Sequence, residues 1–126
     1  MHLPTALLAT LALAFHAGTA TAAGDAAAGK TTFARRCASC HEVGASARNG
    51  FGPQLNGVFG RPAGTAPGFK ASTALQASGI VWSEATLAAF LKAPGKVVPG
   101  NGMRFLGLGD ERQVADVLAY LRAAQP

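Results

Sequence analysis

The sequence predicts an all-α fold in which three to five helices are joined by long loops. Three observations carry this prediction. Apolar residues near the C-terminus recur with helical spacing, which indicates an amphipathic helix. No alternation of apolar and polar residues is long enough for a strand, and the 16 glycines and 7 prolines indicate extended irregular connections.

The first residues differ in composition from the rest of the chain. The apolar run from Ala6 to Phe15 is shorter than the roughly 20 residues of a membrane span, and the small residues 21–23 follow it. This pattern predicts a cleavable signal peptide over 1–23 and a bacterial periplasmic protein, although no Lys or Arg precedes the run. An uncleaved anchoring helix is the alternative. Residues 24–126 then form one domain without a stable membrane span, which we expect to be a monomer.

N-cap residues mark the starts of the first helices. Asp25 is expected to begin a helix that runs to about Ala38. Ser83 is expected to cap a helix over 84–92, which must end near Pro94 because proline interrupts a helix. Between these helices lies a connection over 43–71 that is too rich in Gly, Pro and small residues for regular structure, which is typical of a segment that wraps a ligand. Residues 72–78 could add two helical turns closed by Gly79.

The last helix carries the clearest pattern. Asp110 with Gln113 resembles a capping box, and four apolar residues follow at the spacing of a buried stripe: Val114, Val117, Leu118 and Leu121. Tyr120 flanks this stripe. We expect it to meet Phe33, which shares one face of the first helix with Gly29 and Cys37.

The charge of the chain is basic, and all charged residues follow Ala23. The 11 Lys and Arg against 6 Asp and Glu give a formal net charge of +5, which favours association with acidic protein or membrane surfaces. The basic residues are scattered among Ala and Gly without a basic run, so nucleic-acid binding is not expected.

The segment Cys37-Ala38-Ser39-Cys40-His41 has the spacing of covalent haem attachment, in which two thiols form thioethers and the next imidazole binds iron. Two alternatives are a disulfide redox pair and half of a zinc site. A zinc site needs about four ligands, and no other Cys or His follows Ala23. A redox pair is expected in a βαβ setting, which the helical pattern does not provide. The sequence therefore predicts one haem c bound through Cys37 and Cys40, with His41 as an iron ligand.

The second axial ligand decides between electron transfer and chemistry at an open iron. Met103 is the only methionine after the predicted signal peptide, and it follows the turn-rich residues 98–102. A methionine that only fills a gap in the core is the alternative. We favour ligation by Met103, because no other side chain of a suitable type remains.

Together these residues resemble the class I cytochrome c family over the whole of 24–126. Further matches are Gly52-Pro53-Gln54-Leu55-Asn56-Gly57, Gly60-Arg61, Pro67-Gly68-Phe69, Trp82, and Pro99-Gly100 before Met103. The resemblance implies the cytochrome c fold wrapped around one covalent haem, with His41 and Met103 as axial ligands. It implies that the Pro53 carbonyl accepts a hydrogen bond from His41, that Arg61 lies near a propionate, and that the Trp82 indole donates to a propionate. Asn101, at a position that is commonly polar, is a further candidate for cofactor binding.

Three positions depart from the family pattern. Lys70-Ala71 and Phe90 each stand where the family often has a tyrosine, and Leu75 stands at a commonly polar position. Leu75 and Phe90 predict a drier pocket on the Met103 side, which would disfavour the extra charge of the oxidised iron and raise the reduction potential.

The predicted function is a monohaem electron carrier, not an enzyme, that passes single electrons between respiratory or other periplasmic redox proteins by outer-sphere transfer. The donor would be a cytochrome reductase or dehydrogenase and the acceptor a terminal oxidase or reductase, each with an acidic docking surface. Family analogy assigns four residues to the basic rim that docks them: Lys30, Lys92, Lys96 and Arg104. The alternatives are a dedicated subunit of a dehydrogenase or oxidase complex, and an open-site haem protein that acts on peroxide or binds gas.

Overall fold

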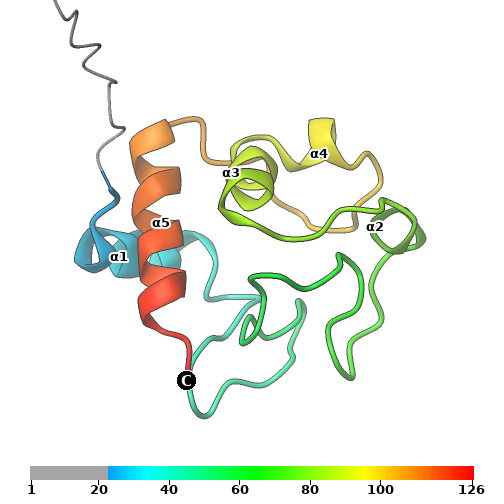
Figure 1. Ribbon diagram of the computed structural model, residues 1–126, viewed down its shortest axis with the longest axis horizontal. Coiled ribbons are helices and arrows are strands. Elements are labelled where there is room, and N and C mark those ends of the chain that lie inside the picture. Colours follow the sequence, from blue (N-terminus) through cyan, green and yellow to red (C-terminus); the bar gives the residue numbers. More distant parts are fainter. Residues whose placement is uncertain (1–22) are drawn as a thin grey trace, which may run out of the picture.

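The computed structural model describes residues 23–126, so the predicted signal peptide lies, except for Ala23, outside the described residues. The helices in this part of the chain are α1 (Ala26–Arg36), α2 (Thr73–Gln76), α3 (Glu84–Lys92), α4 (Pro94–Val97) and α5 (Glu111–Ala123) (Figure 1). Residues 23–126 contain no strand, only an isolated bridge between Pro62 and Val81. The predicted all-α fold is confirmed. No helix in the described range is long and apolar enough to cross a membrane.

Helix α1 begins as its cap predicts and ends earlier than expected. The Asp25 carboxylate accepts from the backbone N–H groups of Ala27 and Ala28, which satisfies two donors of the first turn. The helix ends at Arg36 and not near Ala38, because Cys37 has left helical geometry, with φ −125° and ψ −34°. The residues that follow form a tight turn instead.

Helices α1 and α5 cross at close range (Figure 1). Gly29 is buried there, and a Cβ at this position would overlap the backbone carbonyl of Asp116. The Phe33 and Tyr120 rings meet beside the crossing with centroids 5.3 Å apart and a tilt of 55°, which confirms the predicted contact. The buried Asp116 carboxylate accepts from the Asp25 backbone N–H at 2.7 Å, so it ties the start of α1 to α5.

The middle helices follow their caps, with two corrections. Helix α3 runs over Glu84–Lys92, and Ser83 forms a full capping box with Thr86. Helix α2 is a single turn that ends at Gln76, shorter than the two turns expected over 72–78. Pro94 ends α3 as predicted but also begins α4, which the sequence did not indicate. Proline suits this place because the backbone N–H groups in the first turn of a helix have no acceptor within the helix. The N–H that proline lacks is therefore not needed there.

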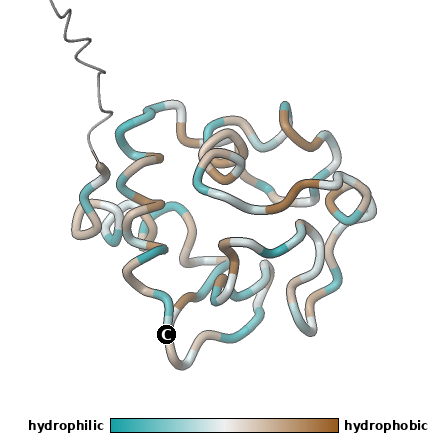
Figure 2. Tube along the Cα trace, viewed as in Figure 1, coloured by the Kyte–Doolittle hydropathy of each residue, from teal (hydrophilic) through white to brown (hydrophobic). Residues whose placement is uncertain are grey.

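One core joins these elements. Its buried hydrophobic members come from α1, α3, α5 and the loops: Phe33, Val58, Ala63, Trp82, Leu87, Phe90, Val98, Leu108, Val114, Val117, Leu118 and Leu121. All four residues of the predicted stripe on α5 are among them. Figure 2 shows hydrophobic and hydrophilic positions alternating along this helix, as expected when one face is buried.

Candidate functional site

The two cysteines lie in the turn that follows α1. The N–H groups of Cys40 and His41 both donate to the Cys37 carbonyl, at 3.1 and 2.9 Å. Both thiols are free, with Cys37 half-buried and Cys40 exposed. Burial raises the pKa of the Cys37 thiol to about 11, and the nearby Arg36 cation opposes this only in part. Reactive redox pairs have a lowered thiol pKa, so this environment argues against a disulfide redox pair.

The same turn is also unsuited to zinc. Among residues 23–126, no group of three or more His, Cys, Asp or Glu side chains is placed to hold a metal ion. A structural zinc site would need four such ligands in a tetrahedron. The free thiols three residues apart and the adjacent imidazole therefore fit covalent attachment of a haem better than either alternative.

His41 is held in one orientation. Its Nδ1 lies 2.8 Å from the Pro53 carbonyl oxygen, which can only accept, so Nδ1 carries the proton and Nε2 is left free to bind a metal. Gly52 also packs against the ring: an added Cβ would lie 2.8 Å from Nδ1 and 2.9 Å from Nε2. The Gly52 N–H in turn donates to the Cys40 carbonyl at 2.9 Å. The 52–53 segment thus fixes both the tautomer and the position of the imidazole.

The Met103 loop is ordered by Asn101. The Asn101 side-chain oxygen accepts from the Met103 N–H at 2.7 Å, and its NH₂ group donates to the Val98 carbonyl at 3.0 Å. Gly100 and Gly102 flank Asn101 with φ of 76° and 83°, the left-handed region that glycine adopts without strain. Asn101 therefore shapes the loop, and its role in binding a cofactor stays a prediction.

The loop is fastened to its surroundings on both sides of Met103. On one side, the Ser72 hydroxyl donates to the Asn101 carbonyl at 2.8 Å and also caps α2. On the other side, the Leu108 N–H donates to the Leu91 carbonyl of α3 at 2.8 Å. Gly107 makes this approach possible, since a Cβ there would lie 2.8 Å from the Lys92 carbonyl carbon. The sequence indicated neither fastening.

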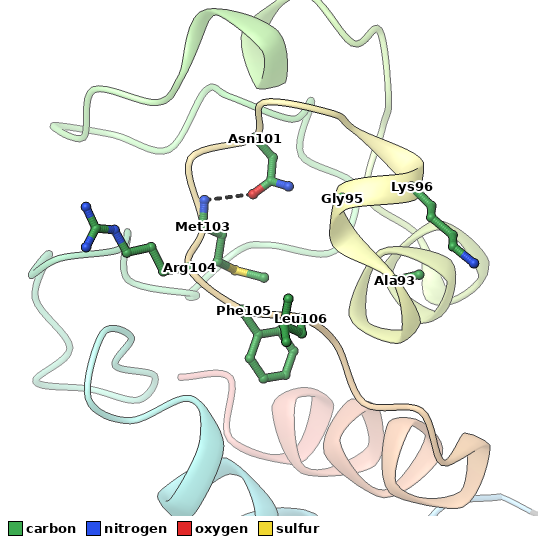
Figure 3. A pocket seen from close by; sticks show the side chains of 8 residues that line it. All are labelled: Ala93, Gly95, Lys96, Asn101, Met103, Arg104, Phe105 and Leu106. Atoms are coloured by element: carbon green, nitrogen blue, oxygen red, sulfur yellow. Dashed lines mark hydrogen bonds between the residues drawn. The ribbon is translucent and has the colours of Figure 1, made fainter.

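Met103 lines a cavity of about 530 Å³, a size within the range of cofactor sites. Figure 3 shows Met103 and Arg104 on opposite sides of the loop backbone, with Phe105 below the methionine. His41 lines a separate cavity of about 390 Å³ beside Phe33 and Tyr120.

Arg61 and Trp82 are brought together by backbone pairing. The Trp82 N–H donates to the Arg61 carbonyl at 2.9 Å, next to the Pro62–Val81 bridge. Partial burial lowers the pKa of the Arg61 guanidinium, which nevertheless stays charged and donates to the Asn56 carbonyl at 3.0 Å. Trp82 is buried, and its indole N–H is its one polar side-chain group. The paired backbone thus brings a residue with a cation next to one with an indole N–H donor, and both types suit the recognition of carboxylates such as haem propionates.

Three of the residues that depart from the family pattern are apolar and buried or half-buried in the structure, whereas Lys70 is exposed. Phe90 is buried and packs on Trp82 with centroids 5.0 Å apart, and Leu75 packs against the same core. Ala71 is buried as well. This packing agrees with the prediction that the pocket on the Met103 side is drier than it would be with polar side chains at these positions.

The four cations of the predicted rim lie in different settings. Lys96 and Arg104 line the Met103 cavity, and Lys30 lines the His41 cavity. Lys92 instead pairs with Glu111 of α5 at 2.7 Å. Its charge is therefore partly neutralised within the chain.

Comparison with known proteins gives a consistent result. A family model described as cytochrome c matches residues 26–125. Cytochrome c-554 from Methylosinus trichosporium is 46% identical over 115 residues, which cover 91% of this chain and 86% of that protein. Cytochrome c2 from Rhodoblastus acidophilus is 48% identical over 99 residues, 79% of this chain and 92% of that one. In solved structures, cytochrome cH from Methylobacterium extorquens superposes with a TM-score of 0.73 at 46% identity, covering 79% of this chain and 99% of the other.

Proposed function

This chain belongs to the cytochrome c family, and from that premise we propose that it is a monohaem electron carrier of the bacterial periplasm. Its cofactor is one haem c, bound covalently through Cys37 and Cys40. When bound, the haem supplies an iron that accepts and releases one electron at a time. The observation that carries the proposal is the fastening of the Met103 loop on both sides, because a fixed methionine would close the iron to small molecules.

His41 and Met103 are the proposed axial ligands. The Pro53 carbonyl, 2.8 Å from His41 Nδ1, would orient the imidazole and increase its basicity. The hydrogen bond from the Met103 N–H to Asn101 would hold the methionine backbone in place before the ligand bond forms. Both ligands would thus be positioned in advance by the chain, which favours a site that changes little between oxidation states.

The remaining site residues would hold the cofactor's edges and exclude water. Arg61 and the Trp82 N–H are the proposed propionate contacts. Water would be excluded from the surroundings of Met103 by buried Phe90 and Trp82 and by half-buried Leu75. Fewer polar groups there disfavour the oxidised state and raise the reduction potential.

The proposed partners are redox proteins with acidic docking surfaces, a reductase or dehydrogenase as donor and an oxidase or reductase as acceptor. The formal net charge of +5 supports this choice. Opposite charges accelerate encounter, and a carrier needs fast, weak association. Lys96 and Arg104, which flank the Met103 cavity, are the cations best placed to take part.

The test compares wild type with Met103→Leu, which keeps an apolar side chain but removes the sulfur. The oxidised wild-type holoprotein should show methionine-to-iron absorption and resist cyanide, whereas the variant should lack this absorption and bind cyanide at once. Arg104→Gln is the matched control, because Arg104 lies on the same loop and points away from Met103 (Figure 3). Immediate high-affinity cyanide binding by the wild type would overturn the carrier assignment.

On a denaturing gel, haem staining should stay with the wild-type band and be lost in Cys37→Ala/Cys40→Ala.

A further inference from the structure

Arg36 lies over the ring of Phe105, with its guanidinium carbon 5.3 Å from the ring centroid. A cation within about 6 Å of an aromatic centroid is attracted to the ring face. Arg36 is the last residue of α1 and is exposed, and Phe105 is half-buried on the Met103 loop. Phe105 also packs against the hydrophobic core, but Arg36 does not belong to that core, and the proposed function assigns nothing to their contact.

The position of this pair in the chain gives it significance. Arg36 directly precedes Cys37, where haem attachment begins, and Phe105 lies two residues after Met103. The Phe105 N–H also donates to the Met103 carbonyl at 2.9 Å, so a movement of the ring is transmitted to the methionine backbone. The other fastenings of the loop, from Ser72 and Leu91, come from the α2 and α3 side. Arg36 instead connects the loop to the segment that carries the cysteines.

We propose that Arg36 is a positioning residue for Met103: its stacking on Phe105 straps the methionine loop to the end of α1 and keeps the second axial position closed. The inference rests on the proposed ligation of iron by Met103. Ligands from solution can bind the iron only while the loop is open. Their apparent affinity is therefore the affinity of the open form multiplied by the fraction of molecules that are open. Weakening the contact between Arg36 and Phe105 raises the fraction of molecules with an open loop, so a ligand from solution binds the iron more tightly.

The test is an imidazole titration of the oxidised holoprotein. An exposed cation–π contact supports a change of about two- to fivefold, so Arg36→Gln should bind imidazole about two to five times more tightly than wild type. Arg36→Lys should restore part of the difference, because an ammonium also interacts with the ring. Arg35→Gln is the matched control, since it removes the same charge from the neighbouring exposed residue of α1. It should leave imidazole binding unchanged.

A double-mutant cycle with Phe105→Leu separates the strap from a general loss of stability. If Arg36 acts through the ring, Arg36→Gln should have no further effect once Phe105 is replaced. In a second readout, amide exchange at Phe105 should accelerate about two- to fivefold in Arg36→Gln. The strap is refuted if Arg36→Gln behaves like Arg35→Gln, or if the two effects on imidazole affinity simply multiply.

The two proposals fail in different ways. If Met103 does not bind iron, wild type itself lacks methionine-to-iron absorption and takes up imidazole without competition. If only the strap is wrong, that absorption stays intact in every variant and the cycle shows no coupling.

Discussion

Gly29 allows α1 and α5 to approach closely, and Gly29→Ala tests that approach. An added Cβ would overlap the Asp116 carbonyl oxygen and carbon and would lie 3.0 Å from the Tyr120 Cβ. The first two obstacles are backbone atoms of a helix, which cannot rotate away as the end of a side chain can. The helices must therefore move apart.

The size of the effect follows from two opposing contributions. Alanine in place of glycine inside an unobstructed helix would stabilise it by about 0.5–1 kcal/mol. Overpacking typically costs about 1–3 kcal/mol, and separating the helices also disturbs the Phe33–Tyr120 pair, worth about 0.5–1.5 kcal/mol. We expect a net loss of about 2–3 kcal/mol, which corresponds to a decrease in Tm of roughly 10 °C or more in a domain of this size.

Thermal and urea denaturation of the holoprotein measure this loss. Gly109→Ala is the matched control, because no atom lies within 4 Å of the position its Cβ would take and its φ is not in the left-handed region. That variant should be neutral or slightly more stable. A Gly29→Ala protein as stable as the Gly109→Ala protein would refute the close crossing and the reasoning built on it.

Three further predictions concern single side chains. Gly52→Ala should push the His41 imidazole from the Pro53 carbonyl and cost about 1–3 kcal/mol by overpacking; an unchanged visible spectrum and urea midpoint would contradict this. Asp110→Ala should lower the free energy of unfolding by about 1 kcal/mol, measured in urea, because the N–H groups of Arg112 and Gln113 lose their acceptor. The Lys92 hydrogen bond and charge lower the pKa of Glu111, so the ion pair stabilises the fold above the unfolded pKa of this carboxyl and ceases to do so as pH falls through the lowered folded value. The small excess in Tm of wild type over Glu111→Gln should therefore decline as pH falls below about 4.3, the ordinary pKa of a glutamate, and vanish in stronger acid; a difference that persists there would disprove the assignment.

Helix starts could be predicted from the sequence because their determinants are local. Asp25, Ser83 and Asp110 each cap a helix through N–H groups two or three residues away, a pattern visible in the sequence. Helix ends were predicted less well. Helix α1 ends before Ala38 because the Cys37 turn competes with the helix. The sequence does not indicate α4, because a proline such as Pro94 can either interrupt a helix or begin one.

The candidate site also contains features that the sequence predicts and features that it does not. The cysteines and His41 form a contiguous motif, so their proposed chemistry could be predicted from the sequence alone. The fastening of the Met103 loop could not, because Ser72 and Asn101 are 29 residues apart and the bond uses a backbone carbonyl, which leaves no signature in residue type. Gly107 is also uninformative by itself. Only its approach to Lys92 shows why a side chain cannot be accommodated there.

Among the four cations of the predicted rim, Lys92 is the one that the described part of the chain holds in an ion pair. The resemblance assigns it to the docking rim together with Lys96 and Arg104, but its ammonium is bonded to Glu111, and this carboxylate would oppose an acidic partner at that place. The cations that line the Met103 cavity have no such partner among the described residues. If the proposed acidic partners dock, they would therefore be attracted more strongly to the Met103 loop than to the α3–α5 contact. The same loop carries Phe105, on whose ring Arg36 lies, so the proposed docking and the proposed closure of the iron site would involve one segment of the chain.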